Sequence, residues 1–276
     1  MIVLDAILHW LGRPPGRKFS GFLAAALVAA LLAHMVWMLN WRGVGIFLLF
    51  GFGVPYLAEG LGIRRGIAGA RYCYTGWVGP LLPLGVPLYV MIAWVGLLYG
   101  VSNIPMASLV WLTAWKGLDA FSVIPCVIIS IVTGLAMSAF DTIIDPIAVR
   151  EGRWTWEKGG LWYGIPYGDF VGWFIVTFLT ILPIFLIQVS GLPDSLFNYY
   201  PQYLPEYPSP YLIFAPTAML GLLLLHLAGR AKGNGLAKLA WISCIEGVLT
   251  LLIYVGVALI YEVENHSIFI VIERGL

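Results

Sequence analysis

Residues 121–146 read FSVIPCVIISIVTGLAMSAFDTIIDP, and this stretch decides the class of fold. Its first part, 121–140, contains no charged side chain and is long enough, at about 1.5 Å per residue, to cross the roughly 30 Å hydrocarbon core of a bilayer. The stretch then ends in Asp141, Asp145 and Pro146. We therefore predict a transmembrane helix over 121–140 that carries two carboxylates at its end and is terminated by Pro146.

The composition of the whole chain agrees with a membrane protein. Of the 276 residues, 61% are hydrophobic and 11% are charged, and the mean hydropathy is +0.91. Too little polar surface remains to cover a soluble protein of this size, which excludes an ordinary soluble enzyme and a disordered chain. The net charge of +1 argues against a nucleic-acid partner. The three scattered cysteines match neither a disulfide framework nor a zinc site.

Six further apolar stretches have the length of a membrane span. The seven predicted spans lie near residues 20–39, 43–62, 82–101, 121–140, 169–189, 211–228 and 239–260. We predict one all-α domain over residues 1–276, a polytopic integral membrane bundle with about seven transmembrane helices. A shorter stretch, 104–115, is expected to form a separate re-entrant or interfacial helix, and residues 1–12 are expected to form an interfacial helix.

Twelve of the fifteen cationic residues fall on one side of this predicted topology. They are Arg13, Arg17, Lys18, Arg64, Arg65, Arg71, Arg150, Arg153, Lys158, Arg230, Lys232 and Lys238. The positive-inside rule then places the N-terminus and the loop 150–168 in the cytoplasm and the C-terminus outside. We expect a multi-pass protein of a prokaryotic cell membrane.

Ionisable side chains are costly in hydrocarbon, so those in or near the predicted spans are candidates for function. They are Glu59, Asp141, Asp145, Asp169 and Glu246. The topology places all five in the cytoplasmic half of the bundle. Asp169 follows Gly168 and is expected to cap the N-terminus of its helix. Three roles stay open for Glu246: it could be catalytic, it could pair with a cation, or it could hydrogen-bond a neighbouring helix.

Asp141 and Asp145 are four residues apart, which puts both carboxylates on one face of a helix, about 6 Å apart. Two such neighbours resist double ionisation, so one can keep a proton near neutral pH and act as an acid in an apolar site. Two alternatives stay open. The pair could be neutralised at the interface by Arg150 or Arg153, or it could hold magnesium for a diphosphate.

Glu59 lies four residues after Pro55, which breaks the helical hydrogen-bond ladder. Neighbouring glycines allow another backbone or a flat ligand to come close. Glu59 is therefore a second candidate acid. The alternative is an interfacial carboxylate paired with Arg64 or Arg65.

Residues 151–166 are denser in aromatic side chains than an interfacial belt requires. Trp154 and Trp156 alternate with polar residues, and Gly159-Gly160 suits a turn, which predicts a small hairpin or lid beneath the carboxylates. Its aromatic faces could stabilise a cation, and anchoring at the interface explains them equally well. No nucleotide, dinucleotide or metalloprotease motif is present, so we expect no cofactor and no metal.

Two blocks of the sequence resemble the CruF-type carotenoid hydratases. The first reads YLAEGLG at 56–62, GARYCY at 69–74 and GVPL at 85–88. The second reads DTIIDP at 141–146, GRWTW at 152–156, GLWYGIP at 160–166 and DFVGW at 169–173. Together they cover roughly residues 45–175. The resemblance implies a polytopic, cofactor-free enzyme that adds water to the terminal double bond of an acyclic carotenoid, giving a tertiary alcohol.

Combined with this resemblance, the residues predict a site. We expect Glu59, Asp141 and Asp145 to be catalytic and to form one acidic pocket, open to the cytoplasmic side and continued by a long apolar channel. The expected substrate contacts are Tyr56, Tyr72, Tyr74, Trp154, Trp156, Trp162, Tyr163, Asp169 and Trp173. The expected partners are a lipophilic carotenoid, membrane lipid and other enzymes of carotenoid biosynthesis.

Three other functions stay open at this point. A proton-initiated end-group cyclase would use the same kind of acid. An intramembrane prenyltransferase would need a second acidic motif for a magnesium diphosphate, which the sequence lacks. A carotenoid-binding or transport protein would need no catalysis.

Overall fold

The computed structural model describes most of the chain. The described residues are 17–39, 41–66, 71–75, 79–116, 123–189 and 214–273. The interfacial helix predicted for residues 1–12 lies outside these ranges.

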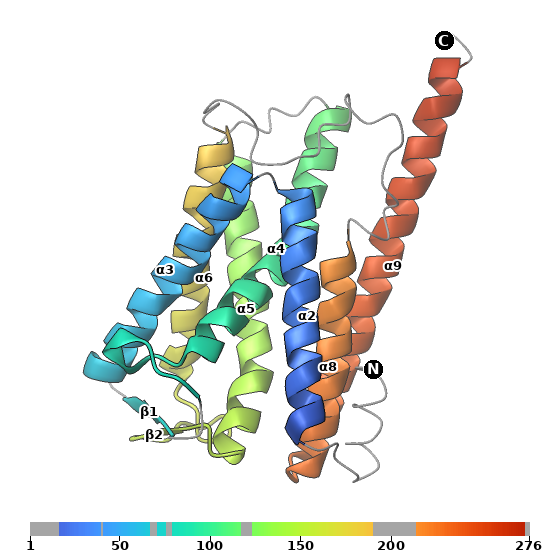
Figure 1. The fold of residues 1–276 in the computed structure, drawn as a ribbon. Coiled ribbons are helices and arrows are strands. Elements are labelled where there is room, and N and C mark those ends of the chain that lie inside the picture. The colour runs from blue at the N-terminus through green and yellow to red at the C-terminus, as the bar shows by residue number, and fades with distance from the viewer. Residues whose placement is uncertain are drawn as a thin grey trace.

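Seven α-helices of the described residues pack side by side into a bundle (Figure 1). They are α2 (Arg17–Met38), α3 (Trp41–Arg65), α4 (Leu88–Lys116), α5 (Val123–Arg150), α6 (Tyr167–Val189), α8 (Ala215–Gly233) and α9 (Ala237–Glu273). Each overlaps one predicted span, and the all-α membrane bundle is confirmed. Among the residues that the structure describes, four helical segments, which lie in α3, α5, α6 and α9, are long and apolar enough to cross a membrane. The number of crossings and the side of the N-terminus stay predictions.

The separate helix predicted over 104–115 is wrong, because α4 continues through Asn103 and Pro105 to Lys116. Proline removes one backbone hydrogen bond from a helix and often bends it without ending it. Figure 1 shows α4 in two differently inclined stretches.

Helix α5 also runs past its predicted end, since Pro146 lies inside it and the helix ends at Arg150. Pro146 has no N–H to give to the carbonyl of Thr142, four residues earlier. The indole Nε1 of Trp162 donates to that carbonyl at 2.8 Å. The prediction failed because a distant side chain supplies the hydrogen bond that the proline cannot.

Replacing Trp162 by phenylalanine tests this compensation. Trp162→Phe keeps an aromatic ring but leaves the Thr142 carbonyl without its donor, which should cost about 1–2 kcal/mol of unfolding free energy. The loss should appear as a lower thermal unfolding midpoint of the purified protein. Tyr167→Phe, at a side chain that is 61% exposed, is the control and should leave the midpoint unchanged. Equal midpoints for both variants would contradict the compensation.

Helices α5 and α6 approach closely because small side chains lie between them. A Cβ on Gly134 would lie 2.8 Å from a ring carbon of Phe174, and the hydroxyl of Ser138 donates to the Phe170 carbonyl at 2.8 Å. Asp141 and Asp145 follow Ser138 at helical spacing on the same face of α5. Both aspartates are therefore directed at the beginning of α6.

Two short strands, β1 (Tyr72–Tyr74) and β2 (Trp154–Trp156), form an antiparallel sheet at one end of the bundle (Figure 1). The local hairpin predicted around Gly159-Gly160 is therefore wrong, because β2 pairs with the connection between α3 and α4, and the alternative of a lid stays a prediction. Gly160 has another role. A Cβ there would lie 2.0 Å from the carbonyl oxygen of Ile165, so only glycine lets the two backbone segments come this close.

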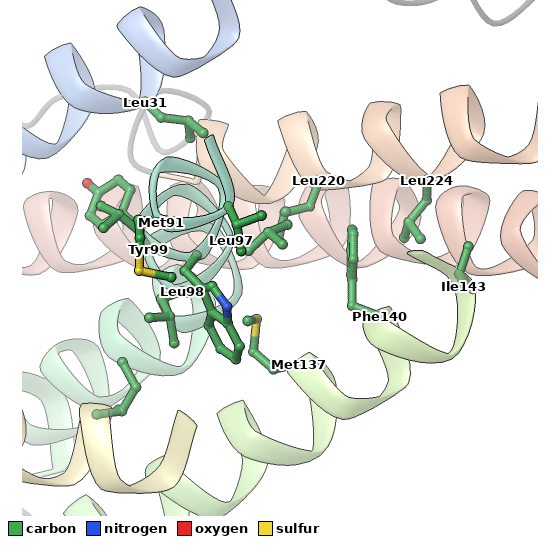
Figure 2. Close-up of a cluster of buried hydrophobic side chains, with 14 of the residues drawn as sticks. Leu31, Met91, Leu97, Leu98, Tyr99, Met137, Phe140, Ile143, Leu220 and Leu224 are labelled. Atoms are coloured by element: carbon green, nitrogen blue, oxygen red, sulfur yellow. The ribbon is translucent and has the colours of Figure 1, made fainter. Parts of the chain in front are cut away.

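The buried apolar core is centred on α4 (Figure 2). Met91, Leu98 and Tyr99 of this helix are fully buried. Side chains of α5 and α8, among them Met137 and Leu220, pack around them. This core holds α4 in place, and with it the α4 side chains that face the site.

Candidate active site

A cavity of about 320 Å³ lies between the helices and reaches both strands. Its lining includes Pro216 and Arg230 of α8, which are fourteen residues, or about 21 Å of helix axis, apart. Polar and aromatic side chains line the part near the strands: Glu59, Tyr72, Tyr74, Tyr89, Trp94, Asp145, Arg153, Trp154, Trp156, Asp169, Trp173 and Arg230. Apolar side chains line the other part: Leu31, Leu97, Met219, Leu220, Leu223 and Leu227. The cavity thus has a polar end and an apolar arm.

Glu59 of α3 accepts hydrogen bonds from three side chains at the polar end. Its Oε2 accepts from the hydroxyls of Tyr72 at 2.5 Å and Tyr74 at 2.9 Å, and its Oε1 accepts from the indole Nε1 of Trp94 at 2.9 Å. The residue is only 9% exposed. An ionised carboxylate accepts and cannot donate, so it can take all three bonds at once.

The two tyrosines of β1 are firm donors to this carboxylate. Burial, followed by the neighbouring charge of Glu59, raises the pKa of both Tyr72 and Tyr74 well above the usual value of a phenol. Both hydroxyls therefore keep their protons at any physiological pH. Their bonds fix the orientation of the Glu59 carboxylate.

Three more carboxyl groups meet where α5 packs on α6. Asp141, Asp145 and Asp169 each place a carboxylate oxygen within 4.8 Å of the other two, and they are 0%, 3% and 5% exposed. The indole Nε1 of Trp156 donates to Oδ2 of Asp145 at 3.4 Å. Both oxygens of Asp141 and Oδ2 of Asp169 have no hydrogen-bond partner among the described residues.

Such a cluster cannot carry three full negative charges without compensation. Like charges a few ångströms apart and away from water repel strongly, so the group either keeps protons or holds a cation. Carboxylate oxygens are suitable ligands for a divalent cation, and Asp141, Asp145 and Asp169 are the residues that could hold one.

The register of the sheet turns four aromatic rings toward the cavity. Tyr72 lies opposite Trp156, with ring centroids 5.0 Å apart, and Tyr74 lies opposite Trp154, at 5.7 Å. Alternate residues of a strand point to one face, which explains why all four line the cavity. The intervening Cys73 is exposed.

A second aromatic wall comes from the helices. The rings of Trp94 on α4 and Trp173 on α6 are stacked, with centroids 4.2 Å apart and 24° between their planes. Both line the same cavity. The faces of such rings attract positive charge through their quadrupoles.

A charged bridge links the turn after α5 to α8 at the polar end. Glu151 accepts a hydrogen bond from Nε of Arg153 at 3.1 Å and one from Nε of Arg230 at 2.9 Å. Burial opposes ionisation, but Arg230 and Arg153 hold the pKa of Glu151 below its usual value. The bridge therefore stabilises the fold at neutral pH, and this stabilisation is lost as the pH falls through the acidic range in which Glu151 takes up a proton.

Comparison with known proteins identifies the family. The family model described as carotenoid biosynthesis protein matches residues 19–195, which is well over half of the chain. The chain belongs to the carotenoid biosynthesis protein family. The resemblance found over residues 45–175 is thereby confirmed at the level of the family. No curated protein and no solved structure matches the chain.

In this carotenoid biosynthesis protein, the structure brings the three residues predicted to be catalytic into one region. Glu59 and Asp145 line the cavity, and Asp141 joins it through its cluster with Asp145 and Asp169. The cavity continues along apolar side chains of α8, while the long channel and its opening to the cytoplasmic side stay predictions. Glu246 on α9 is not among the lining residues.

Glu59 and Asp141 do not form the ion pairs with arginines that we considered as alternatives to a catalytic role. Glu59 is bonded to Tyr72, Tyr74 and Trp94, while Arg64 and Arg65 are exposed. The oxygens of Asp141, as noted above, bond to neither Arg150 nor Arg153.

The prediction that Asp169 caps the N-terminus of its helix is wrong. Helix α6 begins at Tyr167, and the Asp169 N–H bonds to the Pro166 carbonyl at 3.0 Å, so Asp169 lies inside the first turn and does not cap the helix. The positive end of the helix dipole favours an acid there. Its side chain belongs to the carboxyl cluster.

Six of the nine predicted substrate contacts line the cavity: Tyr72, Tyr74, Trp154, Trp156, Asp169 and Trp173. Three do not. Tyr56 donates to the Pro83 carbonyl at 2.6 Å, Trp162 donates to the backbone of α5, and Tyr163 is 36% exposed.

Our reading of the sequence missed Tyr89, Trp94 and Arg230. Tyr89 and Trp94 lie in an apolar stretch, where aromatic residues are ordinary core material. The only local signal is a hydrogen-bonding group within a predicted span, and Trp94 carries an N–H that needs a buried acceptor. That acceptor, Glu59, is 35 residues away in the sequence.

Proposed function

We propose that this carotenoid biosynthesis protein is a hydratase, which adds water to the terminal double bond of an acyclic carotenoid end group. One observation carries the proposal: a cluster of buried carboxyl groups, a separately held carboxylate and two aromatic walls meet in one cavity with an apolar arm. A hydrocarbon end group has no polar atom to recognise, so such a cavity binds it by burying apolar surface.

The first step is protonation of the alkene. Asp145 or Asp169, which reach the cavity, gives a proton to the less substituted carbon of the double bond. The π bond breaks, and the other carbon becomes a tertiary cation. The crowding of Asp141, Asp145 and Asp169 supports this role, because it keeps a proton within the cluster.

The cation then needs an environment that favours positive charge. The rings of Trp94 and Trp173 on one side, and of Trp154 and Trp156 on the other, supply aromatic faces. The ionised Glu59 adds a fixed negative charge. A carboxylic acid alone is a weak acid for an alkene, so stabilisation of the cation provides much of the driving force.

Capture by water completes the reaction. The oxygen of a water molecule bonds to the cationic carbon, and one of its protons passes to Glu59. Glu59 later releases that proton to solvent, and the aspartate cluster takes one up. The sum is the addition of one water molecule, with no oxidant or reductant involved.

Heavy-oxygen water tests this proposal directly. The protein is purified into lipid nanodiscs and incubated with an acyclic, lycopene-like carotenoid in H2¹⁸O. We expect a tertiary alcohol that carries one ¹⁸O per hydrated end, formed equally well with and without EDTA. A ring product without label would indicate a cyclase, and unchanged bound pigment would indicate a binding protein. Loss of activity with EDTA and its return with magnesium would mean that the aspartate cluster holds a metal.

A further inference from the structure

The hydroxyl of Tyr89 is the unusual group of the cavity. It belongs to a residue that lines the cavity, its oxygen is buried, and its proton meets no acceptor in the part of the chain that the structure describes. The hydrogen-bonding side chain next to it is Arg153, which can only donate. The other tyrosine hydroxyls nearby are occupied, since those of Tyr72 and Tyr74 bond to Glu59 and that of Tyr56 bonds to Pro83. Buried hydroxyls are almost always hydrogen-bonded, so Tyr89 is built to bind something in the cavity.

The surroundings of Tyr89 select a small polar molecule. The Arg153 guanidinium carbon lies 5.9 Å from the centre of the Tyr89 ring, and the charged side chains of Glu59, Arg153 and Arg230 line the same cavity. A water molecule at this hydroxyl can accept a hydrogen bond from it and donate one to a carboxylate. Away from this polar end the lining is aliphatic and offers water little, so a water molecule that reacts inside the cavity belongs near Tyr89 and its charged neighbours.

We infer that Tyr89 holds the water molecule that captures the cation, and that it thereby decides between hydration and return to an alkene. This inference rests on the proposed function. A tertiary cation can react in two ways. Water can add to it, or it can lose a neighbouring proton to a carboxylate and become an alkene again. A water molecule held beside the cationic carbon favours addition, because the nucleophile is already in place.

Capture by water and loss of a proton give different products in heavy water. In D2O the first step delivers deuterium to the alkene. Every cation that loses a proton can then leave deuterium in the recovered carotenoid, while every captured cation appears as alcohol. The ratio of alcohol to deuterated alkene reports the partition of the cation. It does not depend on how much of a variant is folded.

The test is Tyr89→Phe, which removes the hydroxyl and keeps the ring. We expect the ratio of alcohol to deuterated alkene to fall about tenfold or more, the effect of losing one positioning hydrogen bond. The total of both products should fall far less. Tyr56→Phe is the matched control, because its hydroxyl bonds to Pro83 and does not line the cavity, and it should keep the wild-type ratio.

Two results would overturn the assignment of Tyr89. One is a Tyr89→Phe variant with an unchanged ratio, and the other is a variant that loses alcohol and deuterium exchange together, which indicates a structural role. Failure of the proposed function looks different, since the wild-type protein itself would then form no alcohol.

Discussion

Replacing Asp145 by asparagine is expected to lower the rate of hydration by roughly 10²–10⁴-fold, the usual effect of removing a general acid or base. The amide has nearly the same shape as the carboxyl group and can still accept the hydrogen bond from Trp156. It has no carboxylic proton to give to an alkene. Asp169→Asn should cause a loss of the same size, because Asp169 shares the cluster and also lines the cavity.

The measurement is ¹⁸O-labelled alcohol formed per folded molecule, with folding followed by thermal unfolding in nanodiscs. Glu246→Gln is the matched control, since Glu246 is a carboxyl group on α9 that does not line the cavity, and its activity should be unchanged. Near-normal turnover in both Asp145→Asn and Asp169→Asn would show that the proton comes from another group.

Replacing Glu59 by glutamine should have the second large effect, a loss of activity of about a hundredfold or more. Glutamine removes the negative charge that stabilises the cation and the base that takes the proton from water. It also replaces three charge-assisted hydrogen bonds by weaker neutral ones, because the hydroxyls of Tyr72 and Tyr74 must then accept from its NH2 group while its carbonyl oxygen accepts from Trp94. The variant should therefore be less stable as well as less active.

Two further variants separate charge from hydrogen bonding at Glu59. Tyr72→Phe and Trp94→Phe each remove one donor but leave the carboxylate in place, so both should keep much more activity than Glu59→Gln. The comparison uses turnover per folded molecule, with the exposed Glu157→Gln as the control. If Tyr72→Phe loses as much activity as Glu59→Gln, then Glu59 acts as a structural anchor for β1 and has no direct part in the reaction.

Much of the fold could be predicted because membrane spans are a local property of the chain. A run such as 121–140 cannot remain in water and must satisfy its backbone within one helix, whatever the rest of the chain does. The ends of the helices were less predictable. At Pro146 the missing hydrogen bond belongs to the backbone, but its replacement comes from Trp162, which lies in another segment.

In the candidate site, too, some features follow from local residue spacing and others from tertiary packing. The spacing of Asp141 and Asp145 by itself determined that both carboxylates share one face of a helix, because that follows from 3.6 residues per turn. Apolar composition likewise determined the bundle. Only the tertiary structure decided that Asp169 would join the pair, since this depends on how closely Gly134 lets α5 approach α6.

The aromatic part of the site was decided by contacts between distant segments. The alternation of Trp154 and Trp156 with polar residues determined a strand with one aromatic face, but not its partner, because strand pairing has no local signature. Its pairing with β1 brings Tyr72 to the cavity, and the packing of α4 on α3 brings Trp94 to Glu59. Local residue spacing thus determined which chemical groups share one helix or strand face, and only packing over long sequence separations decided which faces meet around one cavity.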